Sequence, residues 1–338
     1  MATVALDTRD AFVPMPHGSG IYARRLAEAL RAAASADGLE YWFLERGGRL
    51  PELWWEQITF PRLLRARRPG IVHTPNCFLP LHRPCPGIVT IHDLAFEAHP
   101  RDFSRRTGWK YRTFARRAAR SAERVICDSC FTRDDVCARY GVDPARTRVI
   151  PLAPALASGP RSPPPAPYLL AVGDLRPKKN LERLVTAWRS LREEGLPHRL
   201  VLVGADAGQG ARLRELAGDE PLQLTGFAGD EEVDALMRGA DLLVHPSLYE
   251  GFGMAVVEAM ARDCPVAMAD ATALPETGGD AAVYFDPYDP AAITTAVRSV
   301  IEDPARRAQL VAAGRARVAE LTWERTAAAT VAVYRELL

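Results

Sequence analysis

Runs of apolar residues and longer segments with helical periodicity alternate along the whole chain. In the first half, the apolar runs predict strands at residues 4–6, 41–44, 71–73, 88–91, 125–127 and 149–150. Between them, helical periodicity predicts helices at 20–34, 51–67, 104–121 and 133–140. Such alternation is typical of parallel sheets that are covered by helices on both faces.

A proline-rich stretch at residues 158–167 interrupts this pattern, with five prolines in ten residues. Proline lacks a backbone donor and fixes φ, so the stretch suits neither a helix nor a central strand, and we predict an interdomain linker. After it, strands are predicted at 168–172, 199–203, 222–224, 242–245, 266–269 and 283–285. Helices are predicted at 181–194, 210–217, 231–239, 253–261, 291–300, 304–320 and 323–338.

The two halves together predict an α/β fold of two facing Rossmann-like domains, each built on a doubly wound parallel sheet. We place the N-terminal domain at 1–157 and the C-terminal domain at 168–322. The closing helix at 323–338 should pack back toward the N-terminal domain. Ligands of such sheets bind beyond the carboxyl ends of the strands, so we expect the site in the cleft between the domains.

Composition narrows the class of protein. A length of 338 residues suits two domains, and 48% hydrophobic with 25% charged residues excludes a disordered chain. No apolar run approaches the ~20 residues of a membrane-spanning helix, and the N-terminus lacks the layout of a signal peptide, so we expect a cytoplasmic protein. Six cysteines without repeating spacing favour free thiols, although Cys127 and Cys130 form one metal-like pair.

Charge is distributed unevenly although the formal net charge is only +1. Residues 1–158 contain 24 Lys and Arg against 16 Asp and Glu, whereas residues 159–338 contain 19 against 26. The first half therefore has a net positive charge that favours binding of an anionic partner. Lysine is scarce, with 3 Lys to 40 Arg, so the adjacent pair Lys178 and Lys179 stands out.

The segment 245–261 carries the clearest chemical signal. A predicted strand ends at His245, a glycine-rich loop follows, and a helix begins near Gly253. Glycines let a backbone approach a ligand closely, and the free N–H groups at a helix start suit a phosphate. Glu250 in the loop and Glu258 on the helix can hold hydroxyl groups of two sugars. The alternative interpretation is a helix cap beside a surface glutamate.

Several segments, in this order, resemble glycosyltransferase family 4, a group of retaining enzymes with the GT-B fold of two facing Rossmann-like domains. Glu250 and Glu258 match the family's signature of two glutamates separated by seven residues. Further similar segments are 17–26, 91–94, 128–133, 172–180, 274–276, 285–289 and 323–325. The resemblance covers nearly the whole chain. It implies transfer of a sugar from a nucleotide donor held by residues 168–322 to an acceptor bound by residues 1–157.

This resemblance also implies roles for single residues. Glu258 should bind the ribose hydroxyls, and Glu250 should lie against the transferred sugar or its phosphate. Lys179 should neutralise the diphosphate, whose charge grows as the glycosidic bond breaks; the alternative is that both lysines belong to a solvated turn. The expected donor-binding residues are Gly18, Gly20, Arg176, Lys178, Lys179, Phe252, Gly253 and Glu258.

The phosphate-binding turn departs from the family pattern at one position. Many relatives carry Arg where this chain has Asp174, and an acid there would repel a diphosphate, so either Arg176 or Lys178 replaces that Arg or Asp174 turns away. Asn180 should cap the following helix and aim its amides at the phosphates. No two aspartates stand two apart in the sequence, so the Asp-x-Asp device that holds a divalent metal is missing. We predict no metal and no other cofactor.

Two histidines lie at the carboxyl ends of consecutive predicted strands: His73 ends the strand at 71–73, and His92 follows the strand at 88–91. The resemblance implies that His92 touches the donor sugar near the reacting carbon, which makes His92, Glu250 and Lys179 the expected catalytic residues. His73 is expected on the acceptor side. Retaining members lack an evident nucleophile, so the resemblance implies a same-face mechanism in which the leaving phosphate accepts the incoming proton. Residues 92–103 look most like mannosyltransferases, which makes GDP-mannose the first expectation for the donor and a UDP-sugar the next.

Residues 101–124 hold nine basic side chains against Asp102 and Glu123, and the basic positions cover about half of a helical wheel. A solvated face of an arginine-rich protein is the simple interpretation. The alternative is that Arg116, Arg117 and Arg120 meet an anionic acceptor, such as a lipid-linked phosphate, or attach the protein peripherally to an anionic membrane. The expected acceptor is thus a small molecule, a glycan or a lipid-linked group, and no nucleic acid is expected.

Two other function classes compete with a glycosyltransferase. Gly18, Gly20 and Ala23 loosely fit the dinucleotide fingerprint of an NAD(P)-dependent oxidoreductase. That fingerprint needs its glycines at the tip of a strand, however, and the first predicted strand ends at Leu6. A non-catalytic nucleotide-sugar-binding protein would carry the same motifs as the enzyme. Product formation from a panel of nucleotide sugars separates the three classes.

Overall fold

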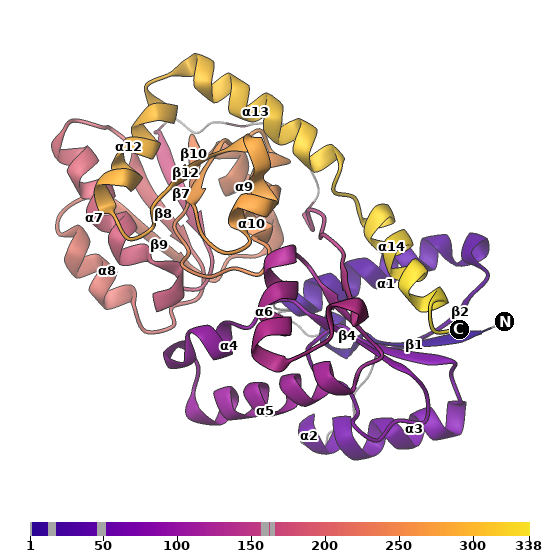
Figure 1. Ribbon diagram of the computed structural model, residues 1–338. Coiled ribbons are helices and arrows are strands. Elements are labelled where there is room, and N and C mark those ends of the chain that lie inside the picture. Colours follow the sequence, from indigo (N-terminus) through magenta and orange to yellow (C-terminus); the bar gives the residue numbers. More distant parts are fainter. Residues whose placement is uncertain (1, 13–17, 46–51, 157–161, 163–165) are drawn as a thin grey trace. The chain divides into compact units, whose positions relative to one another are not determined.

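The computed structural model describes residues 2–12, 18–45, 52–156, 162 and 166–338 (Figure 1). Contacts divide the chain into two compact units, of which unit 1 comprises Met1–Ala155 and Leu321–Leu338 and unit 2 comprises Leu156–Glu320. The chain thus passes between the units twice, and its last helix belongs to the unit that holds its first strand. Most of the predicted linker at 158–167 lies outside the described residues.

Unit 1 is built on a six-stranded parallel sheet with the strand order β2-β1-β3-β4-β5-β6. Its strands are β1 Thr3–Asp7, β2 Glu40–Leu44, β3 Ile71–Thr74, β4 Gly87–Ile91, β5 Arg124–Cys127 and β6 Thr147–Val149. Its α-helices are α1 Gly18–Asp37, α2 Glu52–Trp54, α3 Phe60–Arg67, α4 Ala95–Ala98, α5 Arg105–Ser121, α6 Cys130–Tyr140 and α14 Trp323–Arg335. Helix α14 packs beside α1.

Unit 2 holds a second six-stranded parallel sheet, with the order β12-β11-β10-β7-β8-β9. Its strands are β7 Tyr168–Val172, β8 Arg199–Val203, β9 Leu222–Gly226, β10 Leu242–His245, β11 Val266–Ala269 and β12 Ala282–Phe285. Helices α7, α8 and α12 lie on one face of the sheet, and α9 and α10 lie on the other (Figure 1). The α-helices are α7 Leu181–Glu193, α8 Gly210–Ala217, α9 Asp230–Gly239, α10 Met254–Met260, α11 Leu274–Gly278, α12 Pro290–Ile301 and α13 Pro304–Ala319.

These two units confirm the predicted pair of Rossmann-like domains, and every predicted strand is present within a residue or two of its expected bounds. Helix α6 begins at Cys130 instead of residue 133, because the Ser129 hydroxyl accepts a hydrogen bond from the Thr132 N–H and caps the helix there. The predicted helix at 51–67 is interrupted by a π-helical turn at Trp55–Thr59. Short helices α4 and α11 were not predicted, because they span too few residues to show a period.

Each unit has its own hydrophobic core. In unit 2 the strands bury their apolar side chains against helices on both faces, and Trp188 of α7 is fully buried there. The core of unit 1 lies between its sheet and helices such as α3 and α5. All six cysteines are free thiols. None of the helices in the described ranges is both long and apolar enough to cross a membrane.

Candidate active site

The strand order of unit 2 contains a topological switch point between β7 and β10. Strands β8 and β9 follow β7 in one direction across the sheet, and β11 and β12 follow β10 in the other. Because the connecting helices leave to opposite faces at such a point, a crevice opens beyond the carboxyl ends of the two strands. Gly173 follows β7, and His245 ends β10. The sequence motifs around 172–180 and 245–261 therefore meet at one place.

A charged cluster surrounds Glu250 at this switch point. Its Oε1 atom lies 2.5 Å from Lys179 Nζ and 3.2 Å from His245 Nε2, and its Oε2 atom lies 4.0 Å from Lys178 Nζ. The Thr272 hydroxyl accepts a hydrogen bond from the Glu250 backbone N–H. Two cations around one carboxylate leave the cluster with a net positive charge, which suits an anionic ligand.

Burial and neighbouring charges set the protonation of the cluster. Burial alone would raise the pKa of Glu250, but Lys179 and then Lys178 outweigh it and hold that pKa well below the usual value of 4.5. Burial lowers the pKa of His245 below 6.5, and both lysines lower it further against the pull of Glu250. At neutral pH the cluster therefore contains an ionised Glu250 and a neutral His245.

Close backbone approach explains two glycines, one in the turn after β7 and one directly after β8. A Cβ atom on Gly204 would lie 2.2 Å from the carbonyl oxygen of Gly173, so β8 can run this close to the turn only with glycine. Gly173 has a φ of 141°, and a Cβ atom there would lie 2.9 Å from Lys179 Cε. The missing side chain thus leaves room for the Lys179 stem to fold over the turn toward Glu250.

Asn180 occupies the N-cap position of α7 as predicted, but the prediction that its side chain caps the helix is wrong. Asn180 has a φ of 57°, and its side chain makes no capping hydrogen bond. Instead its buried amide donates to the carbonyl oxygens of Pro246 (3.0 Å) and Pro287 (2.7 Å), while its Oδ1 accepts from Arg183. The side chain therefore ties the loop after β10 to the turn after β12. It has no N–H left to aim at a phosphate.

The acid at position 174 is neutralised within its own turn. Arg176 Nε lies 3.3 Å from Asp174 Oδ2, so the expected replacement cation is already paired with the acid it was meant to offset. Lys178 lies toward Glu250 instead. Among the three expected cations of this turn, Lys178 and Lys179 approach Glu250, whereas Arg176 pairs with Asp174.

The glycine-rich loop leads into α10, as the motif predicts. Phe252 is buried, and Gly253 occupies the N-cap position with a φ of 102°. Glu258 lies in the second turn of α10, where it is partly buried. Its backbone carbonyl accepts a hydrogen bond from Arg262, whose fully buried guanidinium also binds Asp234 of α9. The helix that carries Glu258 is thereby fixed to its neighbour.

In unit 1, the His92 ring is held between two acceptors. Nδ1 lies 2.7 Å from Asp128 Oδ2, and Nε2 lies 3.0 Å from the carbonyl oxygen of Pro75. Both contacts are satisfied when each ring nitrogen carries a proton. Burial lowers the pKa of His92, but Asp128 outweighs burial and raises it. With both nitrogens engaged in this way, the ring has no free lone pair with which to act as a general base.

His73 is placed differently from its predicted role on the acceptor side. Its side chain is fully buried, with Nδ1 2.8 Å from the Tyr334 hydroxyl of α14 and Nε2 2.8 Å from the Thr90 hydroxyl. Burial lowers the pKa of His73 to about 3, so the ring is neutral. With both nitrogens bonded and no exposed surface, His73 is a structural residue of the sheet, and the expectation that it lines a binding surface is wrong.

The other expected residues of unit 1 lie on two helices. Gly18 and Gly20 belong to the first turn of α1, and His17 lies outside the described residues. Arg116, Arg117 and Arg120 are exposed on α5, where the Arg120 side chain donates to the Tyr140 carbonyl oxygen. The glycines and arginines thus lie in unit 1 with His92, whereas Lys179, Glu250 and Glu258 lie in unit 2.

His245 belongs to the cluster although the sequence motifs predicted it only as the end of a strand. Its position as the last of four buried strand residues, directly before the glycine-rich loop, is the signal that could have selected it. Within the described ranges, no group of three or more His, Cys, Asp or Glu side chains is arranged to hold a metal ion.

Comparison with known proteins agrees with this placement of motifs. Residues 157–317 match the family model "Glycosyl transferases group 1", and residues 1–153 match "Glycosyltransferase Family 4". O-antigen chain mannosyltransferase B of Escherichia coli is 29% identical over 329 residues, which cover 90% of this chain and 84% of that one. A second relative, from Mycobacterium tuberculosis, is 31% identical over 242 residues, which cover 68% of this chain and 62% of that one. It is named GDP-mannose-dependent alpha-(1-6)-phosphatidylinositol dimannoside mannosyltransferase.

A solved structure shares the fold over the full length of both chains. It is Anabaena Alr3699/HepE in complex with UDP-glucose, with a TM-score of 0.73 and 18% identity. The two matching family models divide this chain close to the boundary between its two Rossmann-like units. Fold, motifs and relatives together identify the chain as a glycosyltransferase with the GT-B architecture.

Proposed function

We propose that the chain is a retaining, metal-independent member of glycosyltransferase family 4 that transfers a sugar from a nucleoside-diphosphate donor. The observation that carries this proposal is the Lys179–Glu250–His245 cluster at the switch point of unit 2, where doubly wound sheets bind their ligands. The relative that binds UDP-glucose in its structure and the relative named as GDP-mannose-dependent both support a nucleotide-sugar donor.

Unit 2 supplies the residues for the donor. Lys179 has three N–H donors, and Glu250 occupies one, so two remain for the diphosphate. Glu250 thus positions Lys179 before the donor arrives, which reduces the reorganisation that charge stabilisation requires. The backbone N–H groups of Phe252 and Gly253 face the phosphates in this proposal, and Glu258 accepts hydrogen bonds from the ribose hydroxyls.

The proposed reaction proceeds on one face of the sugar. The bond between the anomeric carbon and the diphosphate oxygen breaks, and the acceptor oxygen bonds to the same carbon from the same side. The proton of the acceptor hydroxyl passes to the departing phosphate oxygen, so no protein base is needed. That requirement agrees with His92, because both of its ring nitrogens are already engaged, one by Asp128 and the other by the Pro75 carbonyl oxygen. Lys179 stabilises the charge that grows on the leaving group.

GDP-mannose is the proposed donor, with a UDP-sugar as the second candidate. Two of the reported relatives are named mannosyltransferases, whereas the reported solved structure holds UDP-glucose. Thermal unfolding of the protein with UDP, GDP and ADP decides between the bases, because a ligand that binds the native state raises the unfolding midpoint. We expect the largest rise with GDP, and a larger rise with UDP would replace GDP-mannose in the proposal.

Incubation with a panel of nucleotide sugars and acceptors tests the activity itself. We expect release of a nucleoside diphosphate together with a glycosylated product whose anomeric configuration is that of the donor. Inverted configuration would contradict the retaining assignment. Binding without any product would favour a non-catalytic nucleotide-sugar-binding protein, and reduction of NAD or NADP would favour an oxidoreductase.

A further inference from the structure

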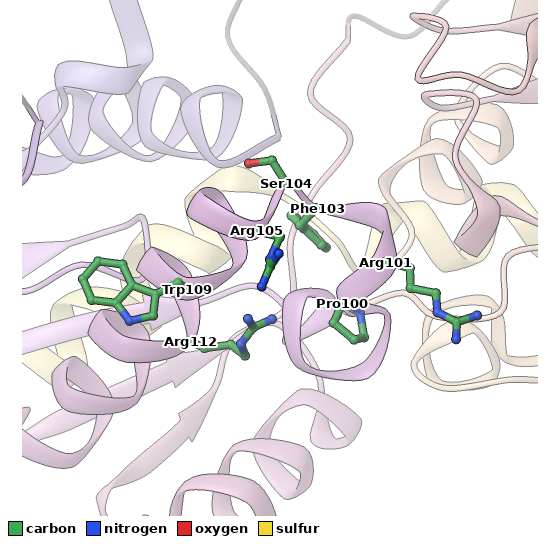
Figure 2. A pocket seen from close by; sticks show the side chains of 7 residues that line it. All are labelled: Pro100, Arg101, Phe103, Ser104, Arg105, Trp109 and Arg112. Carbon is green, nitrogen blue, oxygen red and sulfur yellow. The ribbon is translucent and has the colours of Figure 1, made fainter.

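A basic pocket lies in unit 1 where the turn after α4 leads into α5. It has a volume of about 610 Å³ and is lined by Pro100, Arg101, Phe103, Ser104, Arg105, Trp109 and Arg112 (Figure 2). All of these residues come from one short stretch of unit 1, whereas the cluster around Glu250 belongs to unit 2.

The arginines of this pocket lack acidic partners. Helix α5 contains six Arg and one Lys but no Asp or Glu. Within the described part of the chain, neither Arg101 nor any arginine of α5 forms an ion pair. Figure 2 shows the Arg105 and Arg112 side chains pointing toward one another beneath Phe103. Two uncompensated cations that converge repel each other, and this repulsion is relieved when an anion binds between them.

One of these arginines is placed by a glycine inside the helix. Gly108 lies in the first turn of α5, where glycine is less favourable than alanine. A Cβ atom at Gly108 would lie 3.0 Å from Arg112 Nη1 and 3.5 Å from its Cζ, so the missing methyl group leaves space for the guanidinium. The carbonyl oxygen of Phe96 then accepts one hydrogen bond from Arg112 Nη1. Four of the five N–H donors of the guanidinium remain available.

An aromatic surface adjoins the cations. The Trp109 side chain is 56% exposed, although a side chain of this size is usually buried, and Phe103 and Pro100 line the same pocket. Guanidinium groups bind phosphate oxygens with paired hydrogen bonds, and an exposed indole offers a flat face to a sugar ring or an acyl chain. We propose that this pocket binds a phosphate group attached to a sugar or a lipid, through Arg105 and Arg112, with Trp109 beside the attached group.

Calorimetry tests the pocket with inorganic pyrophosphate and with a hexose 6-phosphate as probes, at low ionic strength. Saturating nucleoside diphosphate blocks the donor site, so that the titration reports on unit 1. The same protein is sedimented with phosphatidylcholine vesicles, with and without phosphatidylglycerol, to detect a lipid source of the phosphate. Binding of a soluble probe would identify a free phosphate compound as the ligand. Binding of anionic vesicles, without binding of a soluble probe, would identify a lipid headgroup as the ligand. Either result supports the proposed pocket if the binding depends on Arg105 and Arg112.

Matched variants establish that dependence. We expect Arg105→Gln with Arg112→Gln to weaken probe or vesicle binding at least about tenfold, because hydrogen bonds to a charged ligand are lost. The control pair, Arg62→Gln with Arg65→Gln, removes the same charge from exposed positions on α3, outside the pocket, and should change binding much less. An equal loss in both pairs, undiminished binding in the first pair, or no binding of any probe to the wild-type protein would overturn the proposal.

A third variant separates ligand binding from folding. Gly108→Ala adds a methyl group that crowds the Arg112 guanidinium but also favours the helix. We expect it to raise the midpoint of thermal unfolding while weakening probe binding severalfold, which is the opposite of what a damaged fold would do. Affinity for the nucleoside diphosphate, measured in the same variants, should stay unchanged. The pocket shares no residue with the proposed donor site, so loss of probe binding, which would overturn this inference, is distinguishable from loss of nucleoside-diphosphate binding, which would overturn the proposed function.

Discussion

Replacing Lys179 by alanine removes the cation nearest to a buried carboxylate. Glu250 would keep His245 at 3.2 Å and Lys178 at 4.0 Å. Removing one partner of a buried ion pair costs about 3–5 kcal/mol. Here the side chains of Lys179 and Glu250 keep 17% and 11% of their exposure, and a second lysine remains nearby, so we expect the free energy of unfolding to fall by roughly 2 kcal/mol.

A second substitution separates this structural effect from catalysis. Glu250→Gln removes the buried charge, so the double variant with Lys179→Ala should recover part of the lost stability. Turnover should not recover, because the leaving diphosphate still lacks its cation. With the donor at saturation, we expect kcat to fall at least about tenfold in Lys179→Ala while KM changes less. The matched control is Lys178→Ala, which removes the same charge from a longer contact and should lose less stability.

The pH dependence of unfolding provides an independent measurement. The pKa of Glu250 in the folded protein lies below its unfolded value. Such a group contributes stability above the unfolded pKa and loses that contribution as the pH falls through the folded pKa. In Lys179→Ala the folded pKa rises, so acid destabilisation should begin at a higher pH than in the wild-type protein. Unchanged stability together with unchanged turnover in Lys179→Ala would refute the reasoning. Recovered turnover in the double variant would show that Lys179 only neutralises Glu250 and does not stabilise the leaving group.

Three further predictions follow from the proposed donor site and the basic helix. Glu258→Gln should weaken nucleoside-diphosphate binding by about 1–3 kcal/mol, because an amide replaces a charged acceptor of ribose hydroxyls; calorimetry checks this, and equal affinity in a folded variant would contradict the ribose role. EDTA should leave the transfer rate unchanged, whereas a rate restored by added divalent metal would show a metal requirement. At low salt, anionic but not neutral liposomes should sediment with the protein. The triple variant Arg116→Gln, Arg117→Gln and Arg120→Gln should lose this liposome binding without losing nucleotide affinity. If the wild-type protein does not bind anionic liposomes, the basic side of α5 is a solvated surface.

The sequence alone was sufficient to predict most of the fold, because its signals are local. Buried parallel strands need runs of apolar residues, and helices need apolar positions at a period of 3.6, so both leave a pattern that can be followed along the chain. Cap residues act at short range too, and Ser104 caps α5 where that helix was predicted to begin. The motif around Lys179 and the loop at Glu250 were also identifiable, because their residue types and spacing lie within single turns and loops.

Only the tertiary structure decided which of these segments meet. The side chains of Lys179 and Glu250, 71 positions apart, come together because β7 and β10 are neighbours at the switch point. Asn180 looked like a helix cap by its position, but its amide finds two carbonyl oxygens on distant loops and satisfies them instead. Competition of this kind depends on atoms that are remote in the sequence, so no local pattern records it.

His73 shows the same limit most clearly. Its place at the end of β3 suggested a side chain that faces a ligand, as the carboxyl ends of parallel strands often do. Tyr334, 261 positions further along the chain, instead covers it and takes one of its ring nitrogens. The chain returns to unit 1 after completing unit 2, and α14 then packs beside α1. A sequence shows that a helix has an apolar face, but the surface that this face covers is determined by the packing of the whole chain.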